Sequence, residues 1–167
     1  MTDKEKRALF NSWVQEYANM IYSVAFRLTN NHTDADDIAQ NTFLKAWKYF
    51  DSFNNQSSVS TWLYKIAMNE AIDWKKKNTE KWEQGLDPQE VLVNVSSSSY
   101  VDFENGKQKF NDAINSLPPK QKAVFIMKFF DDKTYEEIEA ITGTSIGALK
   151  ASYFNAKKKI EEFFESN

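Results

Sequence analysis

The chain has 167 residues, 41% of them hydrophobic and 15% aromatic, which is enough to bury a core in one domain or in two small ones. It contains no cysteine and a single histidine, His32, which excludes disulfides and thiolate metal sites and leaves little basis for a histidine-ligated metal or a histidine general base. The formal net charge of −3 argues against a free-standing DNA-binding domain, because such domains are usually basic.

Only four glycines and three prolines interrupt the chain, and this composition favours helices over a turn-rich sheet protein. No apolar run reaches the length of a membrane span, and the first residues lead into no apolar core of the kind that a signal peptide has. We therefore expect an all-α, cytoplasmic protein without membrane insertion.

The first helical pattern runs from Leu9 to Leu28, where apolar residues recur at helical spacing and predict a buried face. The polar run over residues 29–33 breaks this pattern, and we expect His32 to be solvated in that loop. A second helix is predicted to begin at Thr33, because the threonine hydroxyl can cap it.

Three aspartates, Asp34, Asp36 and Asp37, occupy the first turn of this second helix, where carboxylates complement the helix dipole. On their own they are consistent with capping and solubility. A metal site is not expected, because acids bunched in one turn lack converging ligands from elsewhere. The buried stripe of the helix is predicted to consist of Phe43, Ala46, Trp47 and Phe50.

A polar loop follows at residues 51–58, and a third helix is predicted from Val59 to Lys77. Its core-facing residues are Val59, Trp62, Leu63, Ile66, Ala67 and Ile72. The basic run 75–77 would complement the dipole at the helix end or contact a ligand, and both interpretations stay open.

Helical periodicity fails over residues 78–106, a stretch that contains Gly85, Pro88 and four consecutive serines. A loop of this length is unusual inside a compact domain, so we interpret it as a flexible linker. The predicted layout is two small all-helical domains, residues 1–77 and 107–167, joined by this linker.

In the second domain a helical pattern resumes near Lys107 and leads into the prolines at 118 and 119. Apolar residues then predict another helix up to about Phe130. Thr134 and Glu137, three residues apart, form a capping box that should begin the next helix. Gly143 supplies the positive φ of a tight turn, and Ser145 is a natural N-cap for the last helix.

The last helix has two distinct faces. Its predicted inner face consists of Ile146, Leu149, Tyr153, Ala156 and Ile160, and its outer face of Gly147, Ala151, Phe154 and Lys158. Two helices joined by a turn with glycine, the second small and basic on its outer face, describe a DNA-binding helix-turn-helix. An ordinary helical hairpin has the same pattern, and the fragment alone leaves both open.

Three segments together resemble the extracytoplasmic-function (ECF, group IV) sigma factors of bacterial RNA polymerase. DADDIAQNTFLKAW (34–47) is similar to the polymerase-binding helix of that family, and SSVSTWLYKIAMNEAIDWKKK (57–77) to its −10 promoter helix. LPPKQKAVFIMKFF (117–130), followed by TYEEIEAITGTSIGALKASY (134–153), is similar to its −35 reader. Each motif is moderately specific, and their order and spacing in a chain of this length make the resemblance strong.

The resemblance implies three groups of binding residues. The polymerase-binding group, which would grip the clamp helices of the large polymerase subunit, is Asp36, Asp37, Gln40 and Asn41, with Asn41 where the family usually has glutamate. The −10 DNA-binding group, which includes a pocket for a flipped base, is Asn54, Asn55, Gln56, Ser57, Ser60, Thr61, Lys65, Asn69 and Lys76. The −35 DNA-binding group is Ser145, Gly147, Ala148, Lys150, Ala151, Lys157 and Lys158.

The function implied by the resemblance is promoter-specific initiation with core RNA polymerase, without chemistry of its own and without a cofactor or metal. Promoter DNA and an anti-sigma factor are the further partners implied. The acidic balance then has an explanation, because polymerase would supply much of the attraction to phosphate. The competing hypotheses are a stand-alone helix-turn-helix regulator, a helical adaptor and, on the weakest grounds, an enzyme.

Overall fold

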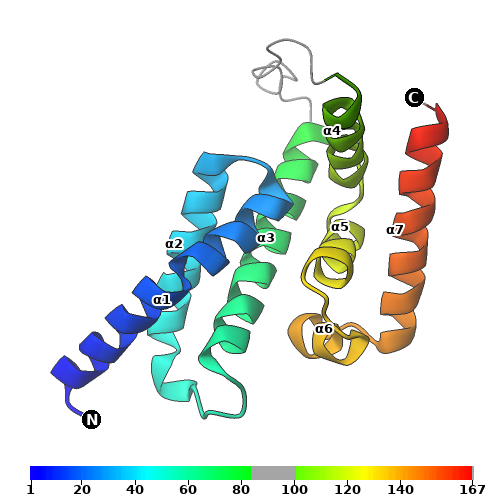
Figure 1. Cartoon of the computed structure of the whole chain (residues 1–167). Coiled ribbons are helices and arrows are strands. Elements are labelled where there is room, and N and C mark those ends of the chain that lie inside the picture. Colours follow the sequence, from blue (N-terminus) through cyan, green and yellow to red (C-terminus); the bar gives the residue numbers. More distant parts are fainter. Residues whose placement is uncertain (84–100, 167) are drawn as a thin grey trace. The chain divides into compact units, whose positions relative to one another are not determined.

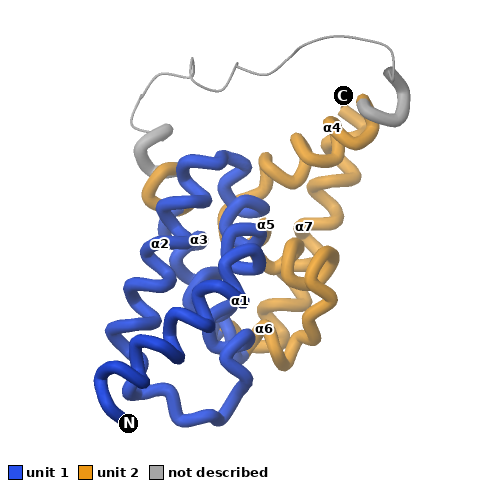
Figure 2. Tube along the Cα trace, turned by 60° about the vertical axis from the view of Figure 1, so that its left-hand side comes forward, with its two compact units in different colours: residues 1–74, 140–143 blue, residues 75–139, 144–167 orange. Residues whose placement is uncertain are grey.

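The computed structural model describes residues 1–83 and 101–166, and every regular element in those ranges is a helix (Figure 1). This confirms the predicted all-α class. The chain divides into two compact units, residues 1–74 with 140–143 and residues 75–139 with 144–167 (Figure 2). Among the described residues, no helix combines the length and the apolar character that a membrane crossing needs.

Helix α1 (Asp3–Thr29) begins six residues before the predicted pattern. The reason is a capping box, in which the Glu5 backbone N–H donates to Thr2 Oγ1 over 3.2 Å and the Thr2 N–H donates to the Glu5 carboxylate over 2.7 Å. The helix ends at Asn30, whose left-handed φ of 51° lets its N–H donate to the carbonyl of Phe26.

Helix α2 (His32–Lys48) is capped by Asn31 and not by Thr33, so the predicted start is wrong. Asn31 Oδ1 accepts a hydrogen bond from the Asp34 N–H at 3.0 Å. His32 therefore lies in the helix rather than in a loop. It is exposed as expected, but its ring stacks on Phe26 at 4.6 Å and its Nδ1 is hydrogen-bonded to the Tyr22 hydroxyl.

A short 3₁₀ helix, η1 (Phe50–Ser52), follows α2, and helix α3 (Val59–Glu83) begins after an exposed loop. An ion pair between Lys45 and Glu70 ties α2 to α3, and the hydrogen bond to the carboxylate raises the pKa of Lys45. Because α3 continues six residues beyond Lys77, the three lysines lie inside the helix. The interpretation of 75–77 as a helix-end cap is wrong.

An aromatic cluster closes one part of the core of the first unit. The Trp13 ring stacks on Phe50 at 5.0 Å, and Phe10 meets Trp47 edge-on at 5.1 Å. Phe10, Trp13 and Phe50 are all buried. Aliphatic side chains from all three helices complete the core, among them Ile21, Leu28, Ile38, Leu63 and Met68.

The predicted linker is helical at both of its ends. Helix α3 runs to Glu83 and helix α4 (Val101–Asn115) begins at Val101, whereas the sequence pattern placed helix only up to 77 and from about 107. The remaining part of the linker, residues 84–100, lies outside the described residues. The domain boundaries at 77 and 106 stay predictions.

Besides the end of α3, the second unit contains α4, α5 (Pro119–Phe125), the π-helix η3 (Ile126–Phe130), α6 (Tyr135–Thr142) up to Glu139, and α7 (Ile146–Ser166). Pro119 begins α5 at a position where its missing N–H has no cost. One core cluster joins α4, α5 and α7 through Ala113, Ile114, Leu117, Phe125, Ala156 and Ile160, with Phe110, Tyr153 and Phe163 packed against it.

The predicted turn between α6 and α7 is confirmed in its details. Thr134 Oγ1 accepts from the Glu137 N–H at 3.1 Å, and the Glu137 carboxylate accepts from the Thr134 N–H at 3.1 Å. Gly143 has a φ of 74°. Ser145 Oγ accepts from the Ala148 N–H at 3.3 Å, which makes Ser145 the cap of α7.

Candidate nucleic-acid interface

The predicted polymerase-binding residues share an exposed face of α2. Asp36, Asp37, Gln40 and Asn41 are all exposed, at a spacing that places them on adjacent turns. Leu44, 67% exposed, and Trp47, 37% exposed, extend the same face by two turns. The sequence pattern did not single out Leu44, and it placed Trp47 in the core.

Trp47 divides its surface between the core and solvent. Its ring meets Phe10 edge-on at 5.1 Å, and Trp47 also lines a surface cleft of about 340 Å³ together with Arg7, Phe10 and Asn11. An exposed leucine and a half-exposed tryptophan beside carboxylates and amides make a mixed surface of the kind that protein partners bind.

The 51–58 loop stands on an aromatic base. Phe53 packs against Trp62 at 4.9 Å and against Trp13 at 5.8 Å. Trp62 is half-buried, whereas the sequence pattern placed it in the core. After Phe53, four exposed polar residues form the loop tip: Asn54, Asn55, Gln56 and Ser57. The loop therefore brings four of the predicted −10 residues together.

Local hydrogen bonds shape the loop tip. The Gln56 N–H donates to Asn54 Oδ1 at 3.3 Å, and Asn55 adopts a left-handed φ of 57°. Ser58 then caps α3, because its Oγ accepts from the Thr61 N–H at 3.1 Å. The side-chain amides of Asn55 and Gln56 and the hydroxyl of Ser57 are thus presented at the surface between two fixed ends.

The α3 residues of the −10 group differ in exposure. Thr61 and Lys65 are exposed, whereas Ser60, Asn69 and Lys76 are half-buried. The Ser60 hydroxyl lies 3.4 Å from the sulfur of Met20, so part of its hydrogen-bonding capacity is used inside the unit. Thr61, Lys65, Asn69 and Lys76 share one side of the helix by their spacing.

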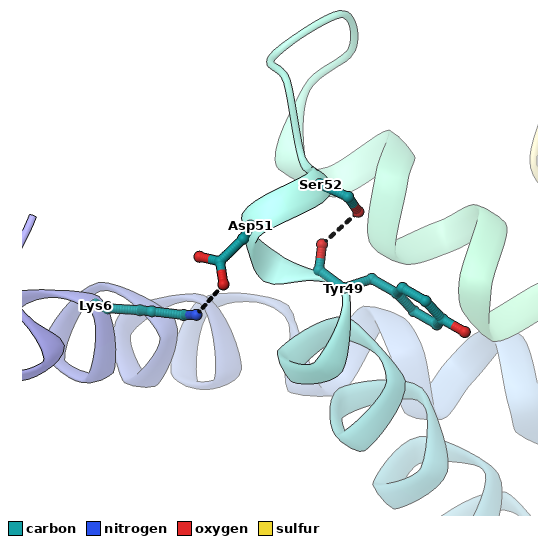
Figure 3. Close-up of polar contacts among 4 residues, drawn as sticks. All are labelled: Lys6, Tyr49, Asp51 and Ser52. Carbon is teal, nitrogen blue, oxygen red and sulfur yellow. Dashed lines mark hydrogen bonds and ion pairs between the residues drawn. The ribbon is translucent and has the colours of Figure 1, made fainter.

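A long-range contact that no sequence pattern indicated anchors the base of the loop (Figure 3). Lys6 Nζ lies 2.7 Å from Asp51 Oδ2. It also lies 5.0 Å above each of the Trp47 and Phe50 rings. Ser52 Oγ donates to the Tyr49 carbonyl over 2.6 Å in the same turn. Lys6 and Asp51 are 45 positions apart, so spacing along the chain could not have paired them.

The predicted −35 residues all lie exposed on α7 or at its cap. Gly147, Ala151, Phe154 and Lys158 form a continuous outer stripe, and Leu149, Ala156 and Ile160 are buried on the other side, as predicted. Phe154 is 65% exposed and stands in the middle of the stripe. Ser145, Ala148, Lys150 and Lys157 flank it.

Two of these lysines are held over aromatic rings. Lys150 Nζ lies 5.8 Å above Tyr135, a residue of α6, and Lys157 Nζ lies 4.8 Å above Tyr153. Such contacts restrict a lysine without neutralising it. The stripe therefore offers positive charge at its edges and small or aromatic groups at its centre.

Among the side chains that the structure describes, no three histidines or carboxylates come together in a way that could hold a metal ion. One buried charge stands out in the second unit. Lys122 is fully buried, donates to Asn115 Oδ1 over 2.8 Å, and has its pKa lowered by burial to about 7. Lys122 is remote in sequence from the residues predicted to bind polymerase or DNA, and we assign it no role in binding.

Comparison with family models gives two matches in chain order. Sigma-70 region 2 matches residues 13–81, and sigma-70 region 4 matches residues 107–160. The first range contains α2, the 51–58 loop and most of α3. The second contains most of α4, all of α5, η3 and α6, and α7 up to Ile160.

Relatives with known roles match over nearly the whole chain. The RNA polymerase sigma factor SigV of Bacillus subtilis is 28% identical over 91% of this chain and 89% of its own length. The ECF RNA polymerase sigma-E factor of Haemophilus influenzae is 26% identical over 94% of this chain and 87% of its own.

Two solved structures have a similar fold. The sigma factor RpoE in complex with the anti-sigma factor NepR, from Bartonella quintana, aligns with a TM-score of 0.68 and 25% identity over 93% of this chain and 96% of its own. CnrH in complex with the cytosolic domain of CnrY aligns with a TM-score of 0.65 at 18% identity, over 96% of this chain and 90% of its own.

Proposed function

The chain belongs to the ECF group of the sigma-70 family of RNA polymerase sigma factors, and we propose which of its residues carry each part of that function. As a sigma factor it directs promoter-specific transcription initiation by core RNA polymerase. The proposal assigns polymerase binding to α2, recognition of the −10 element to the 51–58 loop with α3, and recognition of the −35 element to α7.

The α2 face binds core RNA polymerase in this proposal. Asp36 and Asp37 supply charge, and Gln40 and Asn41 supply amide hydrogen-bonding groups on the next turn. Leu44 and Trp47 add the apolar contact area that the four polar residues lack. Exposed charges at an interface mainly set the orientation of the partners and the rate of association, and they add little affinity. Leu44 and Trp47 therefore carry much of the binding energy.

The 51–58 loop captures a base that leaves the −10 duplex. Extruding a base costs a few kcal/mol, which the pocket must return through hydrogen bonds and stacking. Asn54, Asn55 and Gln56 provide both donors and acceptors for a base edge. The base of the loop, Phe53 between Trp13 and Trp62, is already packed, so capture does not require the loop to order first.

Helix α7 lies in the major groove of the −35 element. The small residues Gly147 and Ala151 permit close approach of the helix. Phe154 is an apolar group able to contact a thymine methyl, and the lysines at 150, 157 and 158 contact phosphates or guanine edges. A stand-alone helix-turn-helix regulator would leave the region 2 match at residues 13–81 without a role.

An anti-sigma factor is the regulatory partner that fits this assignment. RpoE and CnrH were each solved in complex with another protein, an anti-sigma factor in the case of RpoE. A protein that covers the α2 face would block polymerase binding here. We further propose that the protein acts in the cytoplasm, has no catalytic chemistry of its own, and uses residues 1–77 and 107–167 as its two functional domains.

One observation carries the assignment: every predicted contact residue on α2, at the loop tip and on α7 is exposed. Fluorescence anisotropy with a labelled promoter fragment tests it. We expect the free protein to bind weakly because of its net charge of −3, and binding to become tight when core polymerase is added. Tight binding by the free protein, with no further effect of polymerase, would contradict the assignment.

A further inference from the structure

Lys6 is unusual among the lysines of the first unit, because it is placed against groups from two other elements. Its side chain is only 20% exposed, whereas that of its partner Asp51 is 80% exposed. The ammonium group faces the Asp51 carboxylate at 2.7 Å and two ring faces at 5.0 Å, those of Trp47 and Phe50. Figure 3 shows the lysine reaching from α1 to the turn between α2 and α3.

The element that Lys6 contacts has little internal support. Helix η1 is three residues long, held by the Ser52 N–H on the Tyr49 carbonyl at 3.0 Å and the Phe53 N–H on the Phe50 carbonyl at 3.1 Å. Short 3₁₀ segments depend on tertiary contacts for their geometry. Phe50 fixes the buried side of η1, and the Lys6 contact with Asp51 fixes its solvent side.

The loop tip takes its position from η1. Between Phe53 and Ser58 the loop tip has local hydrogen bonds, from the Gln56 N–H to Asn54 Oδ1 and from the Ser57 hydroxyl to the Ser58 carbonyl. The direction in which the tip leaves the domain is therefore set at its two ends, by η1 and by the cap of α3. A small rotation of η1 would displace the side chains that the proposed function assigns to base capture.

We propose that Lys6 is a positioning residue for −10 recognition: by holding Asp51 and capping the Trp47 and Phe50 rings, it fixes η1 and thereby the 51–58 loop. This inference rests on the proposed function of that loop. An ion pair whose carboxylate is 80% exposed and a cation–π contact are each weak, so together they are suited to orient a surface turn and not to hold the domain together.

The test compares Lys6→Met, Lys6→Arg and Asp51→Asn with wild-type protein, each assembled with core polymerase. Opening of a promoter with 2-aminopurine in its −10 element is read by fluorescence. We expect Lys6→Met to form about threefold to tenfold fewer open complexes, since both weak contacts are lost. Asp51→Asn should reduce the number of open complexes less, because the contacts of Lys6 with the two rings remain. Lys6→Arg should form nearly as many open complexes as wild type.

Two further measurements separate positioning from stability. Core binding and the urea midpoint of Lys6→Met should match those of Lys4→Met, a charge-matched control at an exposed lysine two residues away. The double variant Lys6→Met with Asp51→Asn should open promoters no worse than Lys6→Met alone, because the two side chains act through one contact.

The proposal is overturned if Lys6→Met opens promoters as well as wild type, or if its losses in opening, core binding and stability are equal. A separate arm tests the loop itself with Asn55→Ala. If Asn55→Ala reduces opening and Lys6→Met does not, the role of Lys6 falls and the proposed function stands. If neither reduces opening, the role of the loop in base capture falls together with that of Lys6.

Discussion

The 51–58 loop and helix α7 show two ways to present a recognition surface. On α7 the contact residues follow the period of one regular helix, and the buried residues Leu149, Ala156 and Ile160 fix which side faces out. The loop has no such period. Its placement depends on side chains brought from α1, namely Lys6 and Trp13, and from α3, namely Trp62. A helix face is thus specified locally, and a loop only by the assembled core.

The largest expected effect follows from this difference. Trp13→Ala removes the ring on which Phe50 and Phe53 pack, and we expect it to destabilise the first unit by about 3–5 kcal/mol and to abolish promoter opening. Urea unfolding and 2-aminopurine fluorescence measure the two effects. Phe154→Ala, which removes an exposed ring from α7, is the control and should change stability by no more than about 0.5 kcal/mol.

Lys150→Glu tests the helix side of the comparison. Reversing this charge on the exposed face of α7 should weaken promoter binding by about 1–3 kcal/mol, or roughly fivefold to 150-fold, and leave the fold intact. Transcription from a −35-dependent promoter is the readout. Lys120→Glu makes the same charge change on α5, outside the proposed contact face. An equal loss of transcription in that variant would contradict the assignment of −35 recognition to α7.

A third prediction concerns the buried charge of the second unit. The pKa of Lys122 is about 7 in the folded protein, whereas the ordinary value of 10.5 applies to the unfolded chain. Between pH 7 and 10.5 the unfolded chain therefore binds more protons than the folded protein does. Stability should therefore rise with pH across this window and be lost as pH falls towards 7. Between pH 7 and 9 the gain should be about 2 kcal/mol in urea unfolding, and Lys122→Met should lack it.

Absence of any difference in pH dependence between wild type and Lys122→Met would show that the lysine remains solvated in the folded protein. The same pair measured at pH 7 gives a second check. There Lys122→Met should be at least as stable as wild type, because no charged group has to be buried.

The smallest expected effect is on the stability of the protein, and it concerns the two glycines on either side of the start of α7. Gly143→Ala should cost about 1 kcal/mol, because its φ of 74° is strained for any residue with a Cβ. Gly147→Ala lies inside the helix in open space and should instead stabilise by about 0.5 kcal/mol. Thermal unfolding distinguishes the two signs, and a gain from Gly143→Ala would show that the turn relaxes.

The sequence was sufficient for those features that depend on neighbouring residues. The capping box at Thr134, the turn at Gly143 and the outer face of α7 each follow from residues within a few positions of one another. The exposed face of α2 was predicted for the same reason, except that Trp47 lies partly in the core and partly in solvent, which an apolar pattern cannot express.

The predicted helix boundaries were wrong where two residues or two interpretations fit the sequence pattern equally well. Asn31 and Thr33 can both cap a helix, and Asn31 does so in the structure. The lysine run 75–77 resembles a helix end, yet lysine is also a good helix former, and α3 continues to Glu83. The contact of Lys6 with Asp51 spans 45 positions and could be recognised only once the helices were packed.

In the proposed function, the 51–58 loop and α7 read different promoter elements. Transcription by core polymerase over a promoter library randomised in both elements tests it most directly, with wild type, Asn55→Ala and Lys150→Glu compared side by side. We expect Asn55→Ala to change base preference in the −10 element alone and Lys150→Glu to change base preference in the −35 element alone. If either variant shifts the other element, or if neither shifts any preference, the assignment of the two surfaces is contradicted.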